Sequence, residues 1–294
     1  MLAALVVLGC NERQVPDQLA GMIEEVCARA GTAVECVAVE PWGEPGAYRA
    51  PDGEFTSVAA EDWYACALDA AGELTCWGSA ARVYTTPPAG PFASVWLNYN
   101  TACALRADGS AECWVIPQDL PDGTVLAPSS HVGPFSRVTA AGINTCGLRL
   151  DGSMECWYEV ETYFRKLPTE RSGMKEIDGD GAVICVINDD DSLECFGRSG
   201  GGLWRGPKVN QPHGVEVGSG GACVLDASGE PHCWGDNPAW IAQVPEGPFT
   251  QLAGGVRYMC GLRPTGVISC WGCAAASACP ADFEWVGGEL RRVE

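Results

Sequence analysis

The sequence is poor in basic residues, with 18 lysines and arginines against 38 acidic residues, which gives a formal net charge of −20. A strongly acidic surface repels phosphate backbones and anionic lipid headgroups. We therefore expect no nucleic-acid partner and no membrane contact through the folded surface itself.

Catalytic and metal-binding motifs are also scarce. The three histidines, His131, His213 and His232, are far apart in the sequence and lack a metal-binding spacing. No GxxxxGK[ST] phosphate loop occurs. The acidic run 189–191 lacks the alternating ligands of a calcium loop. We expect a protein that is not an enzyme and that holds no cofactor or metal, since a catalytic site would need converging acids or histidines, which the sequence does not show.

The only long apolar run at the start of the chain, MLAALVVLG over residues 1–9, is too short to span a bilayer. Its end and Cys10 read VLGC, which resembles a bacterial lipobox, in which a signal peptide is removed and the cysteine is lipidated. By this resemblance Cys10 carries the lipid, and Asn11 after it indicates the outer membrane of a two-membrane bacterium as the destination. The alternative is a buried strand start with an ordinary cysteine.

One stretch, CALRADGSAECW over residues 103–114, recurs in close variants six times. Alternating apolar and polar residues on both sides of Gly109 predict a β-hairpin. A three-residue loop that ends at the glycine places Cys103 directly opposite Cys113, in a pair whose side chains approach closely if it is not hydrogen-bonded. This geometry permits a disulfide within each hairpin.

Most of the 17 cysteines obey this spacing. Cys27 with Cys36 and Cys273 with Cys279 make two less regular pairs, and Cys10 is left over. Paired cysteines indicate an exported protein in an oxidising compartment, the alternative being small buried thiols in the cytosol. A four-thiolate zinc site formed by the last four cysteines is a further alternative. The six regular pairs are Cys66 and Cys76, Cys103 and Cys113, Cys146 and Cys156, Cys185 and Cys195, Cys223 and Cys233, and Cys260 and Cys270.

Each hairpin belongs to a larger repeated unit. Successive first cysteines are 37, 43, 39, 38 and 37 residues apart. An aromatic residue follows the second cysteine, and a further apolar strand precedes the first, so we expect sheets of at least three strands with both faces buried. All-β units at this period favour a propeller of radially packed blades.

The run from Phe92 to Trp114 and its five counterparts resemble the regulator of chromosome condensation repeat, with an apolar strand, an alanine-leucine pair, an aspartate-glycine turn and a tryptophan-glycine. Val115 and Tyr158 depart from the final glycine. The resemblance covers about residues 53–290 and is nearest to the short-bladed secreted bacterial branch, which includes a propeller-type β-lactamase inhibitor. It implies a β-propeller used as a binding platform.

The N-terminal segment is open to two interpretations. Residues 19–30 have apolar residues at helical spacing, yet residues 27–36 also resemble a degenerate hairpin with Gly31 at its turn. Near the other end, Phe283 and Val286 repeat the spacing of a first strand without a hairpin after them. We therefore expect about seven blades, with a closing blade split between the two chain ends.

The variable segments between the hairpins are expected to be surface loops that carry the contact residues. Aromatic residues and arginine dominate binding hot spots, although the same residues could pack between blades. The candidates are Tyr158, Tyr163, Phe164, Trp204 and Arg205.

These patterns predict an all-β protein with three parts: a signal-peptide-like segment (1–9), a lipidated N-terminal extension that contributes to the closing blade (10–50), and a β-propeller (51–294). We expect a monomeric, non-catalytic module that is exported to the outer membrane or the cell exterior and binds an unknown protein or cell-surface ligand. Inhibition of a secreted enzyme is the alternative, and an enzyme with a site in the central cavity is a third possibility.

Overall fold

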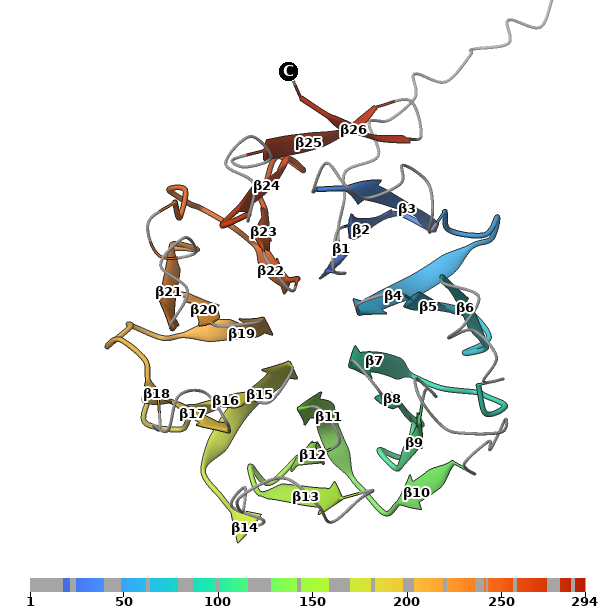
Figure 1. Ribbon diagram of the computed structural model, residues 1–294. Helices are drawn as coiled ribbons and strands as arrows, with labels where there is room; N and C mark the ends of the chain where they lie inside the picture. Colours follow the sequence, from blue (N-terminus) through green and yellow to red (C-terminus); the bar gives the residue numbers. More distant parts are fainter. Residues whose placement is uncertain are drawn as a thin grey trace, which may run out of the picture.

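The computed structural model describes residues 18–21, 25–39, 49–61, 64–78, 87–98, 101–115, 128–141, 144–158, 170–180, 183–197, 204–218, 221–235, 241, 243–255, 258–273, 281–286 and 289–293. Within them the chain forms 26 strands in seven antiparallel sheets, which stand side by side in a ring (Figure 1). The fold is a β-propeller, as the repeats predict.

Each sheet begins with its strand next to the axis, and the chain then moves outward strand by strand (Figure 1). In chain order the sheets are β1 (Gln18–Gly21), β2 (Glu25–Ala30) and β3 (Ala33–Ala38); β4 (Phe55–Glu61), β5 (Tyr64–Asp69) and β6 (Leu74–Gly78); β7 (Ser94–Asn98), β8 (Thr101–Leu105), β9 (Ala111–Val115) and β10 (Ser129–His131); β11 (Phe135–Ala141), β12 (Asn144–Arg149), β13 (Met154–Tyr158) and β14 (Glu170–Arg171); β15 (Met174–Asp180), β16 (Val183–Asn188), β17 (Leu193–Gly197) and β18 (Trp204–Arg205); β19 (His213–Gly218), β20 (Gly221–Leu225) and β21 (Pro231–Gly235); β22 (Gln251–Gly254), β23 (Met259–Leu262), β24 (Ile268–Trp271), β25 (Ala281–Val286) and β26 (Glu289–Arg292).

The hairpin register is the one that the glycine position predicts. Cys103 lies opposite Cys113, and Gly109 closes the turn at a φ of 78° with its N–H donating to the carbonyl of Arg106 at 2.9 Å. In the copy without a turn glycine, Asp191 takes the same left-handed conformation, at a φ of 65°. Backbone geometry at the turn therefore sets which side chains face one another.

Seven local disulfides follow from this register: the six regular pairs and Cys27 with Cys36. Their Cα atoms are 3.9 to 4.1 Å apart, which fits the predicted close type of cross-strand pair. The disulfide between Cys260 and Cys270 leaves no four-thiolate zinc set. Cys273 is also disulfide-bonded, while Cys279 and Cys10 lie outside the described residues.

Adjacent sheets pack face to face, and this packing is the core of the protein. One face of β5 carries Cys66 and Leu68, which pack with Trp114 of the next sheet. The opposite face carries Ala65, which packs with Cys27 of the preceding sheet. Both faces of the hairpins are thus buried, as predicted, and each large apolar side chain that is fully buried contributes roughly 1.5 to 3 kcal/mol.

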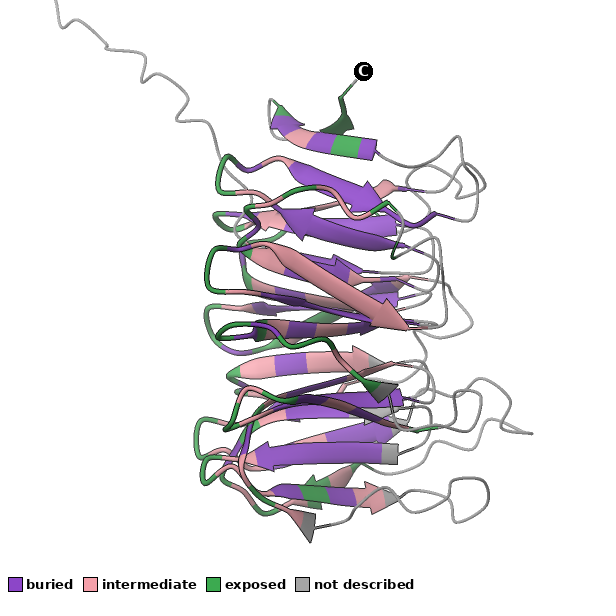
Figure 2. Ribbon diagram, turned by 90° about the vertical axis from the view of Figure 1, so that its left-hand side faces the viewer, coloured by how far each residue is buried: buried purple, intermediate pink, exposed green. Residues whose placement is uncertain are grey.

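The turns between the second and third strands lie on one side of the ring, which we call the turn face. Figure 2 shows these turns in profile as a row of exposed residues along one edge of the molecule. Aspartate side chains fix several of them: Asp108 accepts hydrogen bonds from the N–H and hydroxyl of Ser110, at 2.9 and 2.6 Å. These bonds hold the pKa of Asp108 below its usual value.

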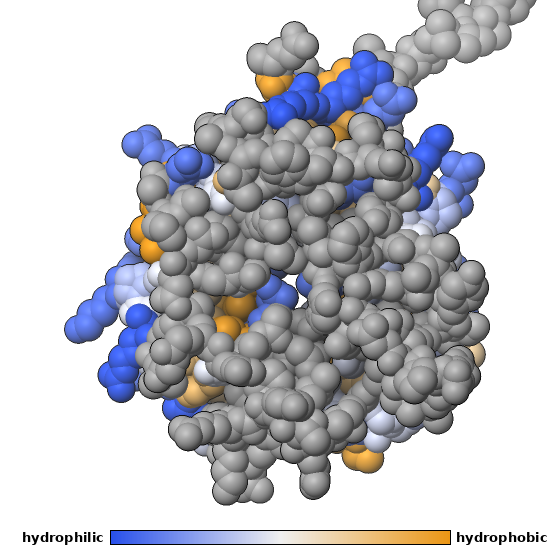
Figure 3. All heavy atoms as spheres, in the orientation of Figure 1, coloured by the Kyte–Doolittle hydropathy of each residue, from blue (hydrophilic) through white to orange (hydrophobic). Residues whose placement is uncertain are grey.

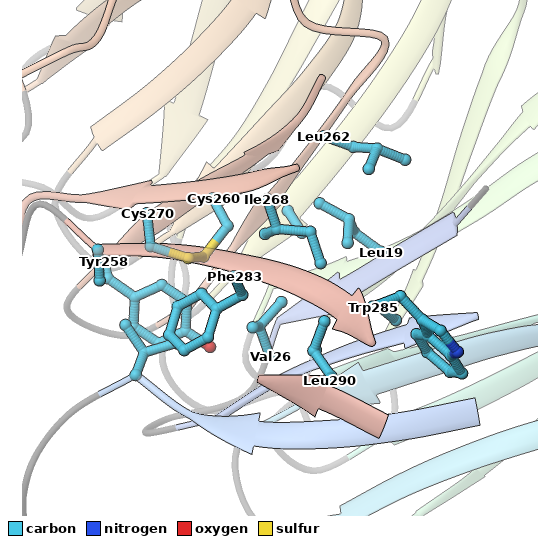
Figure 4. Close-up of a cluster of buried hydrophobic side chains, with 14 of the residues drawn as sticks. Leu19, Val26, Tyr258, Cys260, Leu262, Ile268, Cys270, Phe283, Trp285 and Leu290 are labelled. Atoms are coloured by element: carbon cyan, nitrogen blue, oxygen red, sulfur yellow. A yellow bond between two sulfur atoms is a disulfide. The ribbon is translucent and has the colours of Figure 1, made fainter. Parts of the chain in front are cut away.

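The ring closes where the first sheet meets the last, and residues from both chain ends share one buried cluster there. Leu19 and Val26 of the first sheet lie against Phe283, Trp285 and Leu290 of the C-terminal hairpin β25–β26 (Figure 4). The helical interpretation of residues 19–30 is wrong in the described part, because residues 18–21 and 25–30 are strands and Gly31 lies in a hairpin turn at a φ of 63°.

The predicted split of the closing blade is also wrong. Phe283 and Val286 lie in β25, which pairs with β24 as an outer strand of the last sheet, and β1 supplies the axial strand of the first sheet. The physical reason is burial. An axial strand has neighbours on both faces, whereas β25 alternates buried Phe283 and Trp285 with exposed Asp282 and Val286, so that one face covers the shared cluster and the other meets solvent.

Among the described residues, no helix is long and apolar enough to cross a membrane.

Candidate functional site

A cavity of about 250 Å³ lies on the axis of the ring. Figure 3 shows a hollow at the centre of the molecule with hydrophilic side chains beside it. Its walls come from the axial strands of all seven sheets, β1, β4, β7, β11, β15, β19 and β22. Each of these strands is the edge of its sheet, so that backbone N–H and C=O groups on the axial side need other partners.

Side chains from the neighbouring sheet supply some of these partners. The amide of Gln18 accepts from the N–H of Val58 at 3.1 Å and donates to its carbonyl at 3.0 Å. Gln251 makes the same two contacts with Leu19, at 3.0 and 3.1 Å. Through these bonds the last sheet holds the first and the first holds the second, which stabilises closure of the ring.

On β15 and β19, acidic side chains bond to the backbone of the next sheet, and Arg137 of β11 pairs with one of these side chains. Arg137 donates through Nη2 to Oδ1 of Asp178 at 3.1 Å, and Oδ2 of Asp178 accepts from the N–H of Val217 at 2.8 Å. Oε1 of Glu216 accepts from the N–H of Gly254 at 3.1 Å. One arginine and two carboxyl groups from three consecutive sheets therefore line one side of the cavity.

The proximity of these groups alters their protonation. Burial, together with the negative charge of Asp178, raises the pKa of Glu216 from its usual 4.5 to about 8, although Arg137 opposes the change. Burial also raises the pKa of Asp178, again against the effect of Arg137. At neutral pH the cavity thus holds a largely protonated Glu216 beside an ion pair.

The expectation that no acidic side chains converge is wrong. Asp178 and Glu216, together with Glu61 of β4, reach the cavity from three different sheets. A signal was present, because the residue seven positions before each first cysteine is axial, and that position holds Asp178 and Glu216 in two successive repeats. Comparison of the repeats position by position would have found them.

A second feature lies on the turn face of the sheet β11–β14. Val132 and Leu150 are the two most exposed large apolar side chains of the described residues, at 84% and 71% exposure. The two segments cross, since Arg149 donates to the carbonyl of Val132 at 3.2 Å and the N–H of Leu150 donates to the carbonyl of Pro134 at 3.3 Å. Val132 and Leu150 together form what we call the apolar turn.

The apolar turn is peculiar to one repeat. The residue four positions after the first cysteine is exposed in all six regular hairpins, and only Leu150 is a large aliphatic residue there. The other five are Ala70, Ala107, Asp189, Ala227 and Pro264. Folding therefore does not require leucine at this position.

The contact residues predicted from sequence are not brought together within the described part of the chain. Tyr163 and Phe164 lie outside it, and the side chains of Tyr158, at the end of β13, and Trp204, at the start of β18, are not described. Arg205 is exposed in β18, opposite Glu194 of β17. These five residues stay a prediction.

The histidines lie apart from the cavity. His131 stacks on Trp157 with ring centroids 4.0 Å apart, and burial lowers its pKa. His232 lies 3.1 Å from the carboxylate of Asp226, and His213 is an exposed residue of β19. Among the described residues, no group of three histidine, cysteine or acidic side chains is placed to hold a metal ion.

The fold is similar to several propellers of known structure. The ectodomain of the receptor kinase ACR4 from Arabidopsis thaliana is 20% identical, with a TM-score of 0.66 over 88% of this chain and 96% of that one. The ectodomain of the receptor kinase CR4 from Physcomitrella patens is 24% identical, with a TM-score of 0.68 over 88% and 74%.

Prp20p of Saccharomyces cerevisiae, the yeast RCC1, is 14% identical, with a TM-score of 0.59 over 82% of this chain and 77% of that one. No family model matches the chain, and no curated protein matches it. At these identities the likeness shows the propeller fold alone. The similar structures include RCC1, whose repeat the sequence resembles.

Proposed function

We propose that this protein is an exported, lipid-anchored propeller that binds a protein partner and has no catalytic activity of its own. Propellers of this shape serve as protein-binding modules: Prp20 has been described bound to Kap60, and its binding to Gsp1p and histones has been characterised. The two plant relatives in shape are receptor ectodomains.

The observation that carries the binding proposal is the apolar turn. Val132 and Leu150 expose large apolar side chains on an otherwise acidic protein, at a position where the other repeats have small, polar or cyclic residues. Exposed apolar groups that folding does not require are typical of contact surfaces. Arg149, whose guanidinium lies 4.6 Å from the Phe135 ring centroid and is paired with Glu155, bonds to the carbonyl of Val132 and so fixes the position of the apolar turn.

Export is supported by the seven disulfides, because such bonds form and persist in oxidising compartments. The anchor is proposed from the lipobox resemblance at Cys10. An anchor with several acyl chains would hold the protein against the repulsion between its net charge of −20 and anionic lipids, at about 0.8 kcal/mol per buried CH₂.

The binding proposal is tested by capture of partners from the protein's own membrane fraction with the wild type and two double variants. Val132→Ser with Leu150→Ser should lose the partner. Ala70→Ser with Ala107→Ser, at the equivalent turns, should keep it. Equal capture by both double variants would show that the apolar turn is not the binding surface, and loss on changing Tyr163 and Phe164 instead would favour the predicted loops.

The anchor proposal is tested by Cys10→Ala. We expect the variant to leave washed membranes as a folded propeller, because it lacks the cysteine to which the lipid would be attached. A Cys10→Ala protein that stays on the membrane after high-salt washing would contradict the anchor. If the captured partner is a secreted enzyme, an activity assay with and without the propeller then distinguishes the inhibitor alternative from simple binding.

A further inference from the structure

The central cavity contains a carboxyl group that the fold uses only in part. Oε1 of Glu216 accepts a hydrogen bond from Gly254, whereas Oε2 makes none within the described residues. Asp178, by contrast, uses both of its oxygens, on Arg137 and on Val217. Glu216 therefore has an oxygen that it can offer to a ligand.

The charges around Glu216 favour a cationic ligand. The charged residues that line the cavity are Glu61, Arg137, Asp178 and Glu216, and the positive charge of Arg137 is already paired with Asp178. Asp180, on the same strand as Asp178, adds a further negative charge near Glu216. An anion entering this space would meet an excess of carboxyl groups, whereas a cation would meet one that has a spare acceptor.

An aromatic residue also lines the cavity. Trp96 of β7 is half-buried there, and it packs in part against the apolar cluster that includes Phe135 and Val138. Tryptophan is the aromatic side chain that attracts a cation most strongly. An indole and a carboxylate on one cavity are the groups that recognise an alkylated ammonium.

A metal ion and an organic cation need different protein groups around them. The described residues include no group of three suitable side chains for a metal. The volume of about 250 Å³ exceeds that of a bare ion and suits a short aliphatic amine. We propose that the central cavity binds an alkylammonium group, such as a lysine side chain or a small aliphatic amine, with its charge on the carboxylate of Glu216 and with Trp96 on the surrounding wall.

Binding would be coupled to release of a proton. Glu216 holds its proton at neutral pH because of burial and the charges of Asp178 and Asp180, with Arg137 acting in the opposite direction. An ammonium group favours the ionised carboxyl, so the proton leaves Glu216 for solvent as the cation enters. Affinity should therefore increase as the pH rises towards about 8. The site is separate from the apolar turn, and its test does not depend on protein binding there.

The experiment is isothermal titration calorimetry of the full chain with n-butylammonium chloride, in phosphate and in MOPS at pH 7. Because these buffers differ in protonation enthalpy, the difference between the binding heats in the two buffers gives the number of protons released. We expect saturable one-to-one binding with release of close to one proton, and no binding of n-butanol. Glu216→Gln should weaken binding at least about tenfold and abolish the proton release, because a charged hydrogen bond is lost.

Matched variants distinguish binding at Glu216 from general attraction between a cation and an acidic protein. Glu54→Gln makes the same substitution at an exposed position and should leave affinity and proton release unchanged. Trp96→Leu should weaken binding several-fold while keeping the proton release. Tighter binding of Nα-acetyl-lysine amide than of n-butylammonium would identify a partner's lysine as the ligand. Tighter binding of n-butylammonium would identify a free amine. Absence of saturable binding by the wild type, or equal binding by Glu216→Gln in a folded state verified by circular dichroism, would overturn the proposal.

Discussion

Replacement of Glu216 by glutamine should make the propeller more stable at high pH. The folded state raises the pKa of this carboxyl from 4.5 to about 8, so between these values the folded protein holds a proton that the unfolded chain has released. The free energy of unfolding therefore falls as the pH rises through this window. The stabilising effect is complete below pH 4.5 and is lost above about pH 8.

The size of the effect follows from the same shift. A difference of one unit between the pKa values in the folded and unfolded states corresponds to about 1.4 kcal/mol. The change in the free energy of unfolding over the whole window therefore has a ceiling on the order of 5 kcal/mol. Glu216 is half-buried and faces an open cavity, where water screens its charge, so we expect about 2 kcal/mol. Glutamine keeps an oxygen for the N–H of Gly254 and carries no charge, and it removes the penalty of a second negative group beside Asp178.

The assay is urea unfolding of the wild type, Glu216→Gln and the exposed control Glu54→Gln, at half-unit steps from pH 5 to pH 9. The difference between Glu216→Gln and wild type should be small at pH 5 and should grow to about 2 kcal/mol in favour of glutamine at pH 9. Glu54→Gln should follow the wild type throughout. A Glu216→Gln curve parallel to that of the wild type would show that this carboxyl is ionised in the folded protein at all these pH values, which would refute the reasoning.

Three further outcomes are expected. Gly21→Ala would place a Cβ 2.1 Å from the carbonyl oxygen of Gly254, at the contact between the first and last sheets, and should cost about 1 to 3 kcal/mol in urea unfolding; an unchanged midpoint would mean that the two strands can separate freely. Cys185→Ser with Cys195→Ser removes a disulfide across a separation of 10 residues, so the stability should fall by roughly 2 to 3 kcal/mol with the far-ultraviolet circular dichroism preserved, and non-reducing peptide mapping should show the other local pairs intact. Leu150→Ser should change the thermal midpoint very little, by the equivalent of about 0.5 kcal/mol or less, because the side chain is 71% exposed; a large loss would reveal a packing role instead of a contact surface.

The local structure of this protein could be predicted from its sequence because short-range geometry decides it. One residue in the left-handed conformation, Gly109 or its counterpart Asp191, fixes the hairpin loop, and the loop fixes which cysteines face each other. Alternation of side chains then assigns the two faces of each sheet. The same reasoning gave a degenerate hairpin at 27–36 as one of two open interpretations, and the structure has the hairpin.

Closure of the ring depended on contacts that no local pattern contains. Phe283 repeats the spacing of a first strand, yet its strand became an outer one because only one of its faces has a neighbour to cover. Residues 18–21 occupy the axial position, where Gln18 bonds to the second sheet and Gly21 lies close to the last sheet. Spacing within one repeat cannot distinguish these two outcomes, since the difference lies in which sheet comes to rest beside the strand.

In the cavity, too, the sequence determines the position of each residue, whereas the assembled ring determines its environment. Each axial residue could be assigned from its distance to a cysteine, but the protonation of Glu216 depends on Asp178 of the preceding sheet, on Arg137 of the sheet before that, and on burial by the whole ring. Electrostatic interaction acts through space over a few ångströms, whereas these three residues are about 40 positions apart in the chain. The sequence determined which groups the repeats could present to the axis, and only assembly of the ring decided that an arginine and two acids would share one space.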